Sequence, residues 1–288
     1  MGSGLMTGGI KSAEERAALR MKRAEGARLA GYAHTLSLNV QYNGASFAGF
    51  ARQTQSNKAT VQGELEHALS LLYRREVTTV CAGRTDAGVH ALGQVVSLDL
   101  TEAEFSRRPL CALERSMNAL VDDTISVESA QERPLGFSAR FDAQCREYHY
   151  HICTSSARPV LIAPFVWHLG GVYLDLEAMN EAASFLIGEH DFKSFCVAAS
   201  AADKPTHRKV MELEVYSEEI MGVPIVTLRV VGNAFLHSMV RTMVGTLVEV
   251  GRKKHPPVWV KDVLEARNRC SAGQNAPAHG LVFLHVEY

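Results

Sequence analysis

The sequence lacks any stretch that is both long enough and apolar enough to cross a membrane. The uncharged segment from Val160 to Leu174 is too short for a spanning helix and is interrupted by Pro164, Gly170 and Gly171. The N-terminus also lacks the continuous apolar core of a secretory signal peptide. These absences exclude a membrane protein and lead us to expect a cytoplasmic one.

Cysteine is sparse and follows no metal-binding pattern. The six cysteines include no C-x-x-C pair and stand at positions 81, 111, 145, 153, 196 and 270. A chain of 288 residues can bury a core without disulfides, so we expect free thiols in a reducing compartment. His149 and His151 could form a metal pair on one strand, but no third ligand stands at a useful spacing. We therefore expect no metal here, and glycine-rich phosphate loops of the P-loop or dinucleotide type are missing too.

An excess of charge of one sign is also missing. The chain has 30 Lys and Arg residues against 31 Asp and Glu residues, which gives a net charge of −1. Net charge therefore neither supports nor excludes a polyanionic partner, which would have to bind at local patches. Three basic clusters would suit such a partner or could simply be solvated: Arg107-Arg108, Lys204 to Lys209, and Arg252 to Lys254.

The composition that is present belongs to an ordinary globular protein. Hydrophobic residues make up 47% of the chain and charged residues 21%, which excludes disorder throughout. Residues 1–33 predict an N-terminal extension that is flexible or helical, since Ser12 to Glu15 resembles a capping box before a helix ending near Leu29. That helix has few large apolar residues, so we expect it to pack weakly, as a solvated extension or as an extra RNA contact.

Hydrophobic periodicity predicts strands and helices in mixed order after the extension. Strands are expected at residues 34–42, 77–82, 94–100, 125–130, 145–153, 210–217, 225–231 and 281–288, and helices at 61–72, 110–120, 176–187, 235–250 and 260–267. The order lacks the regular βαβ rhythm of a parallel sheet. We therefore predict an α+β fold whose halves, 34–144 and 145–288, share a mostly antiparallel central sheet with flanking helices. Binding clefts often form where two halves of a protein meet, so we expect the functional site at the boundary between these halves.

One aspartate stands in a loop bracketed by glycines. Gly83 and Gly88 permit tight backbone geometry around Asp86. Arg84 can hold a positive charge beside the carboxylate or reach a phosphate. The same local pattern also fits a turn in which Asp86 only caps its own backbone.

An arginine and a tyrosine are further candidates for chemistry. Arg241 lies in the apolar helical stretch from Ser238 to Val244, where a buried guanidinium would need an anionic partner. It could instead face water on the polar side of that helix. Strand alternation places Tyr148 and Tyr150 on one face, either as core residues or with Tyr148 as a stacking platform for a flat ring.

The segment from Gly83 to Ala91 resembles the TruA family of tRNA pseudouridine synthases. Other segments match the family in the same order over about 250 residues, so that only the N-terminal extension falls outside. These segments are residues 42–49, 60–66, 117–120, 137–141, 146–148, 188–192, 239–241 and 276–281.

The resemblance implies isomerisation of uridine to pseudouridine at positions 38, 39 and 40 of the tRNA anticodon stem-loop, without any cofactor. It also implies two ferredoxin-like halves and a homodimer that grips one tRNA across both subunits. Asp86 matches the catalytic aspartate, Tyr148 the tyrosine against the target base, and Arg241 the arginine that pairs with the aspartate. Arg84 matches the arginine that helps displace the target nucleotide. A synthase of the same fold with another RNA target, and a tRNA-binding module without catalysis, are the alternatives.

Several positions depart from the family's usual pattern, among them the residue that precedes Arg208. Phe50 and Ala51 stand where the family has Trp-Gln, and Cys196 stands where an arginine is common. None matches a catalytic position. We therefore expect these departures to affect contacts with tRNA, not the reaction.

Overall fold

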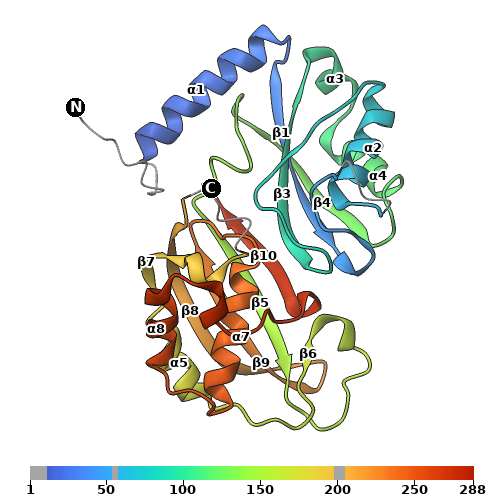
Figure 1. Ribbon diagram of the computed structural model, residues 1–288. Coiled ribbons are helices and arrows are strands. Elements are labelled where there is room, and N and C mark those ends of the chain that lie inside the picture. The colour runs from blue at the N-terminus through green and yellow to red at the C-terminus, as the bar shows by residue number, and fades with distance from the viewer. Residues whose placement is uncertain (1–11, 54–57, 198–204) are drawn as a thin grey trace, which may run out of the picture. The chain divides into compact units, whose positions relative to one another are not determined.

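The computed structural model describes residues 12–53, 58–197 and 205–288, which divide into two compact units (Figure 1). The N-terminal unit contains residues 12–144 together with Phe283–Tyr288, and the C-terminal unit contains Cys145–Val282. Residues 1–11 of the predicted extension and Lys204 of a predicted basic cluster lie outside the described residues. None of the helices in the described ranges is long and apolar enough to cross a membrane.

The N-terminal unit is built on a sheet with the strand order β4-β1-β3-β10. These strands are β1 (His34–Tyr42), β3 (His90–Leu100), β4 (Ile125–Arg133) and β10 (Leu281–Glu287), and the short β2 (Val80–Cys81) pairs with β3. Both neighbours of β1 run antiparallel to it, with Leu38 opposite Val96 and Ala130. The apolar side chains of β1 are buried, as the predicted alternation requires.

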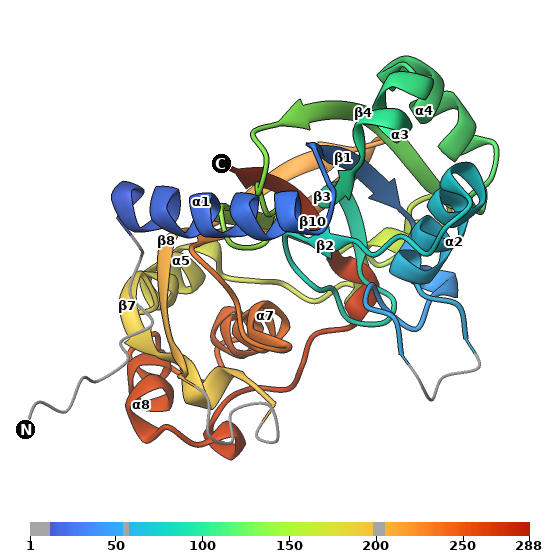
Figure 2. The ribbon, with the colours of Figure 1, turned by 90° about the horizontal axis from the view of Figure 1, so that it is seen from above.

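Helices α2 (Val61–Tyr73) and α4 (Leu110–Asn118) lie on one side of this sheet, and α1 (Ala13–Leu29) lies on the other (Figure 2). The predicted cap of α2 is confirmed, because the Thr60 hydroxyl accepts a hydrogen bond from the Gly63 N–H at 3.2 Å. Leu65 and Leu69 of its apolar stripe are fully buried. A further helix, α3 (Glu102–Arg107), has no buried residue, and the periodicity therefore gave no sign of it.

The N-terminal helix α1 is anchored by an ion pair. Its predicted capping box is confirmed, with Ser12 and Glu15 each bonding the other's backbone N–H. The expectation of weak packing is wrong, because Arg23 donates to both carboxylate oxygens of Asp142 at 2.9 and 2.7 Å. Arg23 also donates through Nε to the Gly136 carbonyl at 2.7 Å. The Asp142 side chain is only 1% exposed. A buried ion pair therefore attaches α1 to the unit, whereas other helices are attached by an apolar stripe.

The C-terminal unit carries the strand order β5-β9-β8-β7. These are β5 (Cys145–Cys153), β7 (Gly188–Asp191), β8 (His207–Ile220) and β9 (Val223–Gly232), all paired antiparallel, while β6 (Trp167–His168) pairs parallel with β5. Its helices are α5 (Leu176–Ser184), α7 (Met239–Gly251) and α8 (Trp259–Ala266). The predicted α+β class with mostly antiparallel pairing is confirmed in each unit.

Several predicted elements are shorter than expected, and two of them differ at the end where they begin or over most of their length. The helix predicted over residues 235–250 begins at Met239, because Ser238 has a left-handed backbone with φ of 60° and cannot continue a helix. The strand predicted over residues 77–82 keeps only Val80 and Cys81. Its partner β3 is longer than predicted and begins at His90.

Candidate active site

Asp86 lies in the loop that joins β2 to β3 in the N-terminal unit. Its side chain is half-buried, whereas the side chain of Arg84 is exposed. The Val89 N–H donates to the Asp86 carbonyl at 3.2 Å, and Gly88 has φ of 80°, so the chain turns immediately after the aspartate. This turn presents a carboxylate in a partly desolvated position, which suits a nucleophile or a group that stabilises developing charge.

Polar side chains in the core of the N-terminal unit form hydrogen bonds to this loop. Gln94 donates through Nε2 to the Gly83 carbonyl at 2.7 Å, and its Oε1 accepts the Gly83 N–H at 3.4 Å. The Tyr42 and Thr85 hydroxyls share a hydrogen bond of 2.7 Å. Gln94 is 0% exposed, and burial raises the pKa of Tyr42, so its phenol stays neutral. The backbone on both sides of Arg84 is thereby fixed.

A second loop, residues 43–50, packs directly against the first. The Phe50 N–H donates to the Thr85 carbonyl at 3.1 Å. Gly49 has φ of 108°, and a Cβ there would lie 3.0 Å from the Thr85 carbonyl oxygen. Only glycine therefore fits this approach without strain.

Two of the departures from the family's pattern lie in the core. Phe50 is fully buried, with its ring centroid 6.0 Å from that of Tyr42. Cys196 is also fully buried, and its thiol donates to the Lys193 carbonyl at 3.4 Å. Neither side chain has exposed surface, so these two departures can change tRNA contacts only through their neighbours, and that effect stays a prediction. Ala51 is half-buried.

The supporting residues Tyr42, Thr85 and Gln94 were not predicted as part of the site. A signal for one of them exists in the sequence, because Gln94 precedes the apolar residues Val95 and Val96 in a strand that is buried almost throughout. A polar side chain at such a position needs a hydrogen-bonding partner. The partner of Gln94 is set by the geometry of the Asp86 loop, and the hydrophobic periodicity of the sequence does not describe that geometry.

Tyr148 and Tyr150 lie on the covered face of β5 in the C-terminal unit. Burial alternates along the strand, which confirms that the two rings share a face. Tyr148 is 7% exposed, and its ring meets Phe235 edge-on with centroids 5.3 Å apart. Tyr150 is fully buried and donates its hydroxyl hydrogen to the Pro277 carbonyl at 2.8 Å. Tyr150 is thus a core residue, whereas Tyr148 retains a small exposed area.

Arg241 lies in the first turn of α7 and is half-buried. Its Nε donates to the Ala276 carbonyl at 2.8 Å, and the Ala276 N–H donates to the Arg241 carbonyl at 3.1 Å. The side chain is therefore held against the chain that precedes β10. The alternative in which it extends into water on the polar side of the helix is wrong.

The predicted site residues are divided between the two units. Asp86 and Arg84 share one loop of the N-terminal unit, while Tyr148 and Arg241 belong to the C-terminal unit. The pairing of Asp86 with Arg241, and the cleft at the seam, stay predictions.

The two histidines of β5 are engaged in ordinary interactions. The His149 ring nitrogen Nε2 lies 2.9 Å from the Glu147 carboxylate, which also accepts a hydrogen bond from Arg229 at 2.7 Å. Burial lowers the pKa of His151 to about 4, so that its ring is neutral near pH 7. Within residues 12–53, 58–197 and 205–288, no group of three or more His, Cys, Asp or Glu side chains is placed to hold a metal ion.

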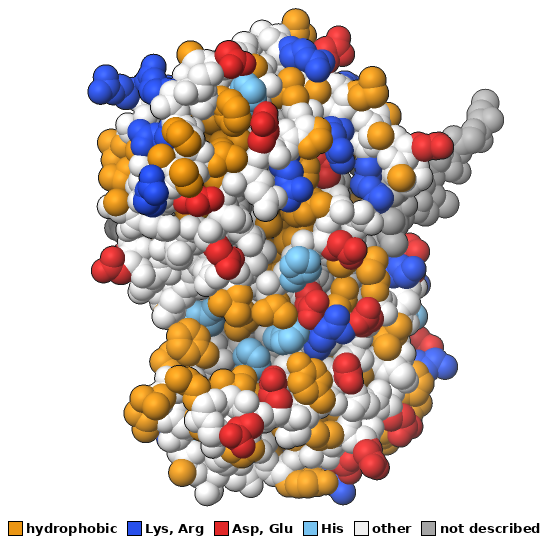
Figure 3. Space-filling view, turned by 180° about the vertical axis from the view of Figure 1, so that it is seen from behind, with side chains coloured by type: hydrophobic (Ala, Val, Ile, Leu, Met, Phe, Trp, Pro, Cys, Tyr) orange, Lys and Arg blue, Asp and Glu red, His pale blue; other side chains and the backbone are white. Residues whose placement is uncertain are grey.

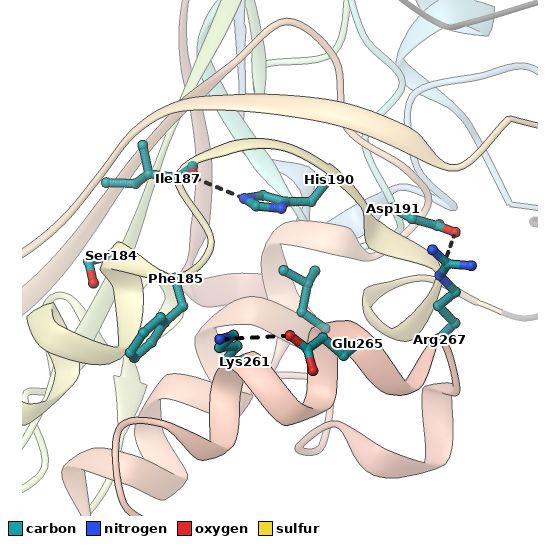
Figure 4. Close-up of a pocket in the computed structure, with 9 residues that line it drawn as sticks. Ser184, Phe185, Ile187, His190, Asp191, Lys261, Glu265 and Arg267 are labelled. Carbon is teal, nitrogen blue, oxygen red and sulfur yellow. Dashed lines mark hydrogen bonds and ion pairs between the residues drawn. The ribbon is translucent and has the colours of Figure 1, made fainter.

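A hollow of about 620 Å³ lies in the C-terminal unit, and none of the predicted site residues lines it (Figure 4). It is lined by Ser184, Phe185, Ile187, His190, Asp191, Lys261, Leu264, Glu265 and Arg267. Arg267 lies 3.4 Å from Asp191, and Lys261 lies 3.9 Å from Glu265. Because these charges pair with one another, the hollow offers no strong attraction for an ionic ligand.

Comparison with known proteins identifies one family. The sequence profile described as tRNA pseudouridine synthase matches residues 39–142 and 182–288. The chain is 41% identical over 257 residues to tRNA pseudouridine synthase A of Pseudoalteromonas atlantica, covering 88% of this chain and 92% of that protein. It is 42% identical over 256 residues to tRNA pseudouridine synthase A of Anoxybacillus flavithermus, covering 88% and 98%.

Among solved structures, the chain is similar to one chain of the crystal structure of a Cbf5-Nop10-Gar1 complex. The identity is 15%, the TM-score is 0.31, and the match covers 74% of this chain and 45% of that one. We draw no conclusion about this chain from a similarity at this TM-score.

Proposed function

The chain belongs to the family of tRNA pseudouridine synthases, and we propose that it isomerises uridines 38, 39 and 40 of the tRNA anticodon stem-loop with Asp86 as the nucleophile. As a pseudouridine synthase it is an isomerase. The observation that carries the assignment to Asp86 is the half-buried carboxylate on a loop whose backbone is fixed by Gln94, Tyr42 and Phe50. A carboxylate held in this way is preorganised for reaction.

The reaction needs a base that is free to turn. The bond between ribose C1′ and uracil N1 breaks, a bond between C1′ and C5 forms, C5 loses its proton and N1 gains one. A base stacked in a helix cannot rotate, so the target nucleotide must be flipped out of the stack. Arg84, exposed two residues before Asp86, is suited to help displace that nucleotide or to hold its phosphate.

The other two residues supply a partner charge and a flat surface. Arg241 balances the charge of the Asp86 carboxylate, and its Nε contact with Ala276 supports this role by fixing the direction of the guanidinium. Tyr148 stacks on the detached uracil, and its edge-on contact with Phe235 supports this role by holding the ring in one plane. A stacking surface keeps a flat base in plane without fixing its rotation.

The proposal also includes the assembly and location of the enzyme. A homodimer gripping one tRNA across both subunits follows from membership in the family, and light scattering of the purified protein tests it. The tRNA substrate class supports a cytoplasmic location.

The decisive experiment measures pseudouridine in unmodified tRNA after incubation with the protein. Product at positions 38, 39 and 40 is detected by carbodiimide-blocked primer extension, since uridine and pseudouridine have equal mass. We expect Asp86→Asn to lower turnover at least about 10³-fold while tRNA binding is nearly unchanged. Asp123→Asn, which alters an exposed carboxylate of the same unit, should behave as wild type.

Each other outcome overturns a distinct part of the proposal. Product at other uridines would show a synthase with a different RNA target. Tight tRNA binding without product from wild type would favour a binding module without catalysis. Turnover by Asp86→Asn near the wild-type rate would overturn the role of Asp86 alone.

A further inference from the structure

The segment 137–141 matches the family, yet the catalytic proposal gives it no role. Two of its side chains point outward, because Arg140 is exposed and Phe141 is 52% exposed. A single exposed aromatic ring is common on protein surfaces, so the charged groups around this one decide what it can bind.

Arginines from two elements surround the Phe141 ring. The Arg140 guanidinium carbon lies 5.4 Å from the ring centroid, and that of Arg23 on α1 lies 6.0 Å from it. Arg23 is at the same time bound to the buried carboxylate of Asp142. Arg23 of α1 thus contacts both the ring and the carboxylate of the residue that follows it.

This small surface is positively charged. Arg20 approaches Asp142 at 3.6 Å, so that Arg20 and Arg23 face one carboxylate. Together with Arg140 beside the Phe141 ring, the three arginines and Asp142 have a formal charge of +2. On the face shown in Figure 3, acidic and basic side chains are interspersed, in keeping with a net charge of −1. A polyanion would therefore be attracted at a local patch such as this one.

We propose that Arg140 and Phe141, held in place by α1, form an accessory contact for tRNA outside the catalytic loop. We call Arg20, Arg23, Arg140 and Phe141 the Arg–Phe surface. Guanidinium groups match phosphate oxygens in charge and geometry, and an exposed ring stacks on an unpaired base. Because the surface combines both features, it fits RNA better than an acidic peptide. The inference rests on the proposed function only in naming tRNA as the partner.

The loop geometry explains why α1 belongs to this surface. Gly136 has φ of 81°, and a Cβ there would lie 2.4 Å from the Ala24 backbone nitrogen. The helix and the loop therefore approach each other backbone to backbone. Loss of α1 would free Arg140 and Phe141 to adopt other positions.

The test measures affinity for unmodified tRNA at several salt concentrations, using the full chain. Arg140→Ala should weaken binding and reduce the slope of log Kd against log salt by about 1, because one phosphate contact is lost. Phe141→Leu keeps an apolar side chain but removes the ring, and it should weaken binding about fivefold or more with the slope unchanged. Phe141→Tyr should restore the affinity.

Controls separate this inference from simple misfolding and from the proposed function. Arg115→Ala removes an exposed arginine of α4, on the other side of the same unit (Figure 2), and should change neither affinity nor slope. Melting temperatures of all variants should match wild type. Wild-type affinity in Arg140→Ala and Phe141→Leu would overturn the accessory contact alone, whereas absence of tRNA binding by wild type would overturn the proposed function itself. Competition by polyglutamate equal to that by oligouridylate would point to an acidic protein partner and overturn the inference.

Discussion

Gln94 uses both ends of its amide on the backbone of a single residue, Gly83. Such a bidentate contact fixes the start of the loop in position and in direction. The next contact along the loop, between Thr85 and Tyr42, fixes the residue just before Asp86. The residues that precede Asp86 are therefore held by neutral groups that do not take part in its chemistry.

Replacement of Gln94 should consequently affect rate more than substrate affinity. Gln94→Leu leaves the Gly83 backbone groups without their partner, which we expect to lower the free energy of unfolding by about 1–3 kcal/mol. A loop displaced by about 1 Å should lower kcat about 100-fold, with little change in Kd for tRNA. Single-turnover kinetics and thermal melting measure the two effects. Unchanged kcat in a destabilised Gln94→Leu protein would mean that the amide only fills the core, and Gln131→Leu on the exposed face of β4 is the control.

How much of the site could be predicted depended on distance along the chain. The Asp86 loop was recognisable because its glycines and its arginine are sequence neighbours. The roles of Tyr42 and Gln94 were not, since each stands in its own strand and reaches the loop only through tertiary hydrogen bonds. The sequence did not distinguish a buried Arg241 from an exposed one. Its partner, the Ala276 carbonyl, lies 35 residues away, and the pattern of apolar residues along a helix does not reveal such a partner.

Helix α1 shows how a polar element can be firmly attached. Its composition predicted weak packing, because the helix has few large apolar residues that could form a buried stripe. The pairing of Arg23 with Asp142 spans 119 positions in the sequence, and no local pattern reports such a contact. Helices with an apolar stripe, such as α2, were predicted well for the opposite reason.

Removal of the Arg23 side chain should destabilise the N-terminal unit. Arg23→Ala leaves the buried Asp142 carboxylate without its main partner, and we expect the free energy of unfolding to fall by about 3 kcal/mol. Asp142→Asn added to Arg23→Ala should recover most of this loss, since a neutral amide tolerates burial better. Urea denaturation measures both. Arg28→Ala, at the exposed end of α1, should have no effect, and an equal loss there would argue against the buried pair.

Deletion of residues 1–33 follows from the same contact. The catalytic residues lie outside the deleted segment, so we expect kcat at 25 °C to be retained. The midpoint of unfolding should nevertheless fall as far as in Arg23→Ala, because the partner of Asp142 is lost in both. A deletion variant as stable as the full chain would contradict the role given to α1.

A histidine joins β1 to two neighbouring elements and makes stability depend on pH. His34 bonds Glu132 of β4 at 2.7 Å and Glu102 of α3 at 2.9 Å, which raises its pKa above the ordinary value of 6.5. Its ring also stacks on Phe105 with centroids 3.9 Å apart. The charged ring is therefore favoured in the folded protein.

The sign of the pH effect follows from the direction of the shift. A raised pKa contributes stability that is complete below pH 6.5 and is lost as pH rises through the folded value. The pKa of Glu102 is lowered by the same contact, so its share is lost only as pH falls into the acid range. We expect the difference in melting temperature between wild type and His34→Gln to be largest near pH 5.5–6 and to shrink toward pH 8. A difference that is constant over this range would show that His34 acts by packing on Phe105.

At the scale of the whole molecule, the chain leaves the N-terminal unit and returns to it. Residues 12–144 form most of that unit, but its strand β10 comes from the last residues of the chain. Phe283 is fully buried, and the Tyr288 hydroxyl donates to the Ala139 carbonyl at 2.9 Å. The C-terminus is thus part of the structure that supports the Asp86 loop, since β10 lies beside β3.

A chain that ends at Val282 should keep its C-terminal unit but lose order in the N-terminal one. Loss of Phe283 alone should lower the free energy of unfolding of the N-terminal unit by at least about 3 kcal/mol. Hydrogen exchange resolved by peptide should show faster exchange in β1 and β3, with β8 and β9 protected as in wild type. Tyr288→Phe, which removes only one hydroxyl, is the mild control. Unchanged protection of β3 in the truncated chain would contradict this dependence.

The return of the chain also sets an order of events during translation. The ribosome releases residues 12–144 first, yet the strand that completes their sheet is synthesised last. At about 5–20 residues per second, the intervening residues 145–282 take on the order of ten seconds to make. For that time the edge of β3 that receives β10 is open on the nascent chain, where chaperones or a neighbouring polysome product can reach it. The strand β3, which carries the Asp86 loop, therefore gains its neighbour β10 only after residues 145–282 have been made.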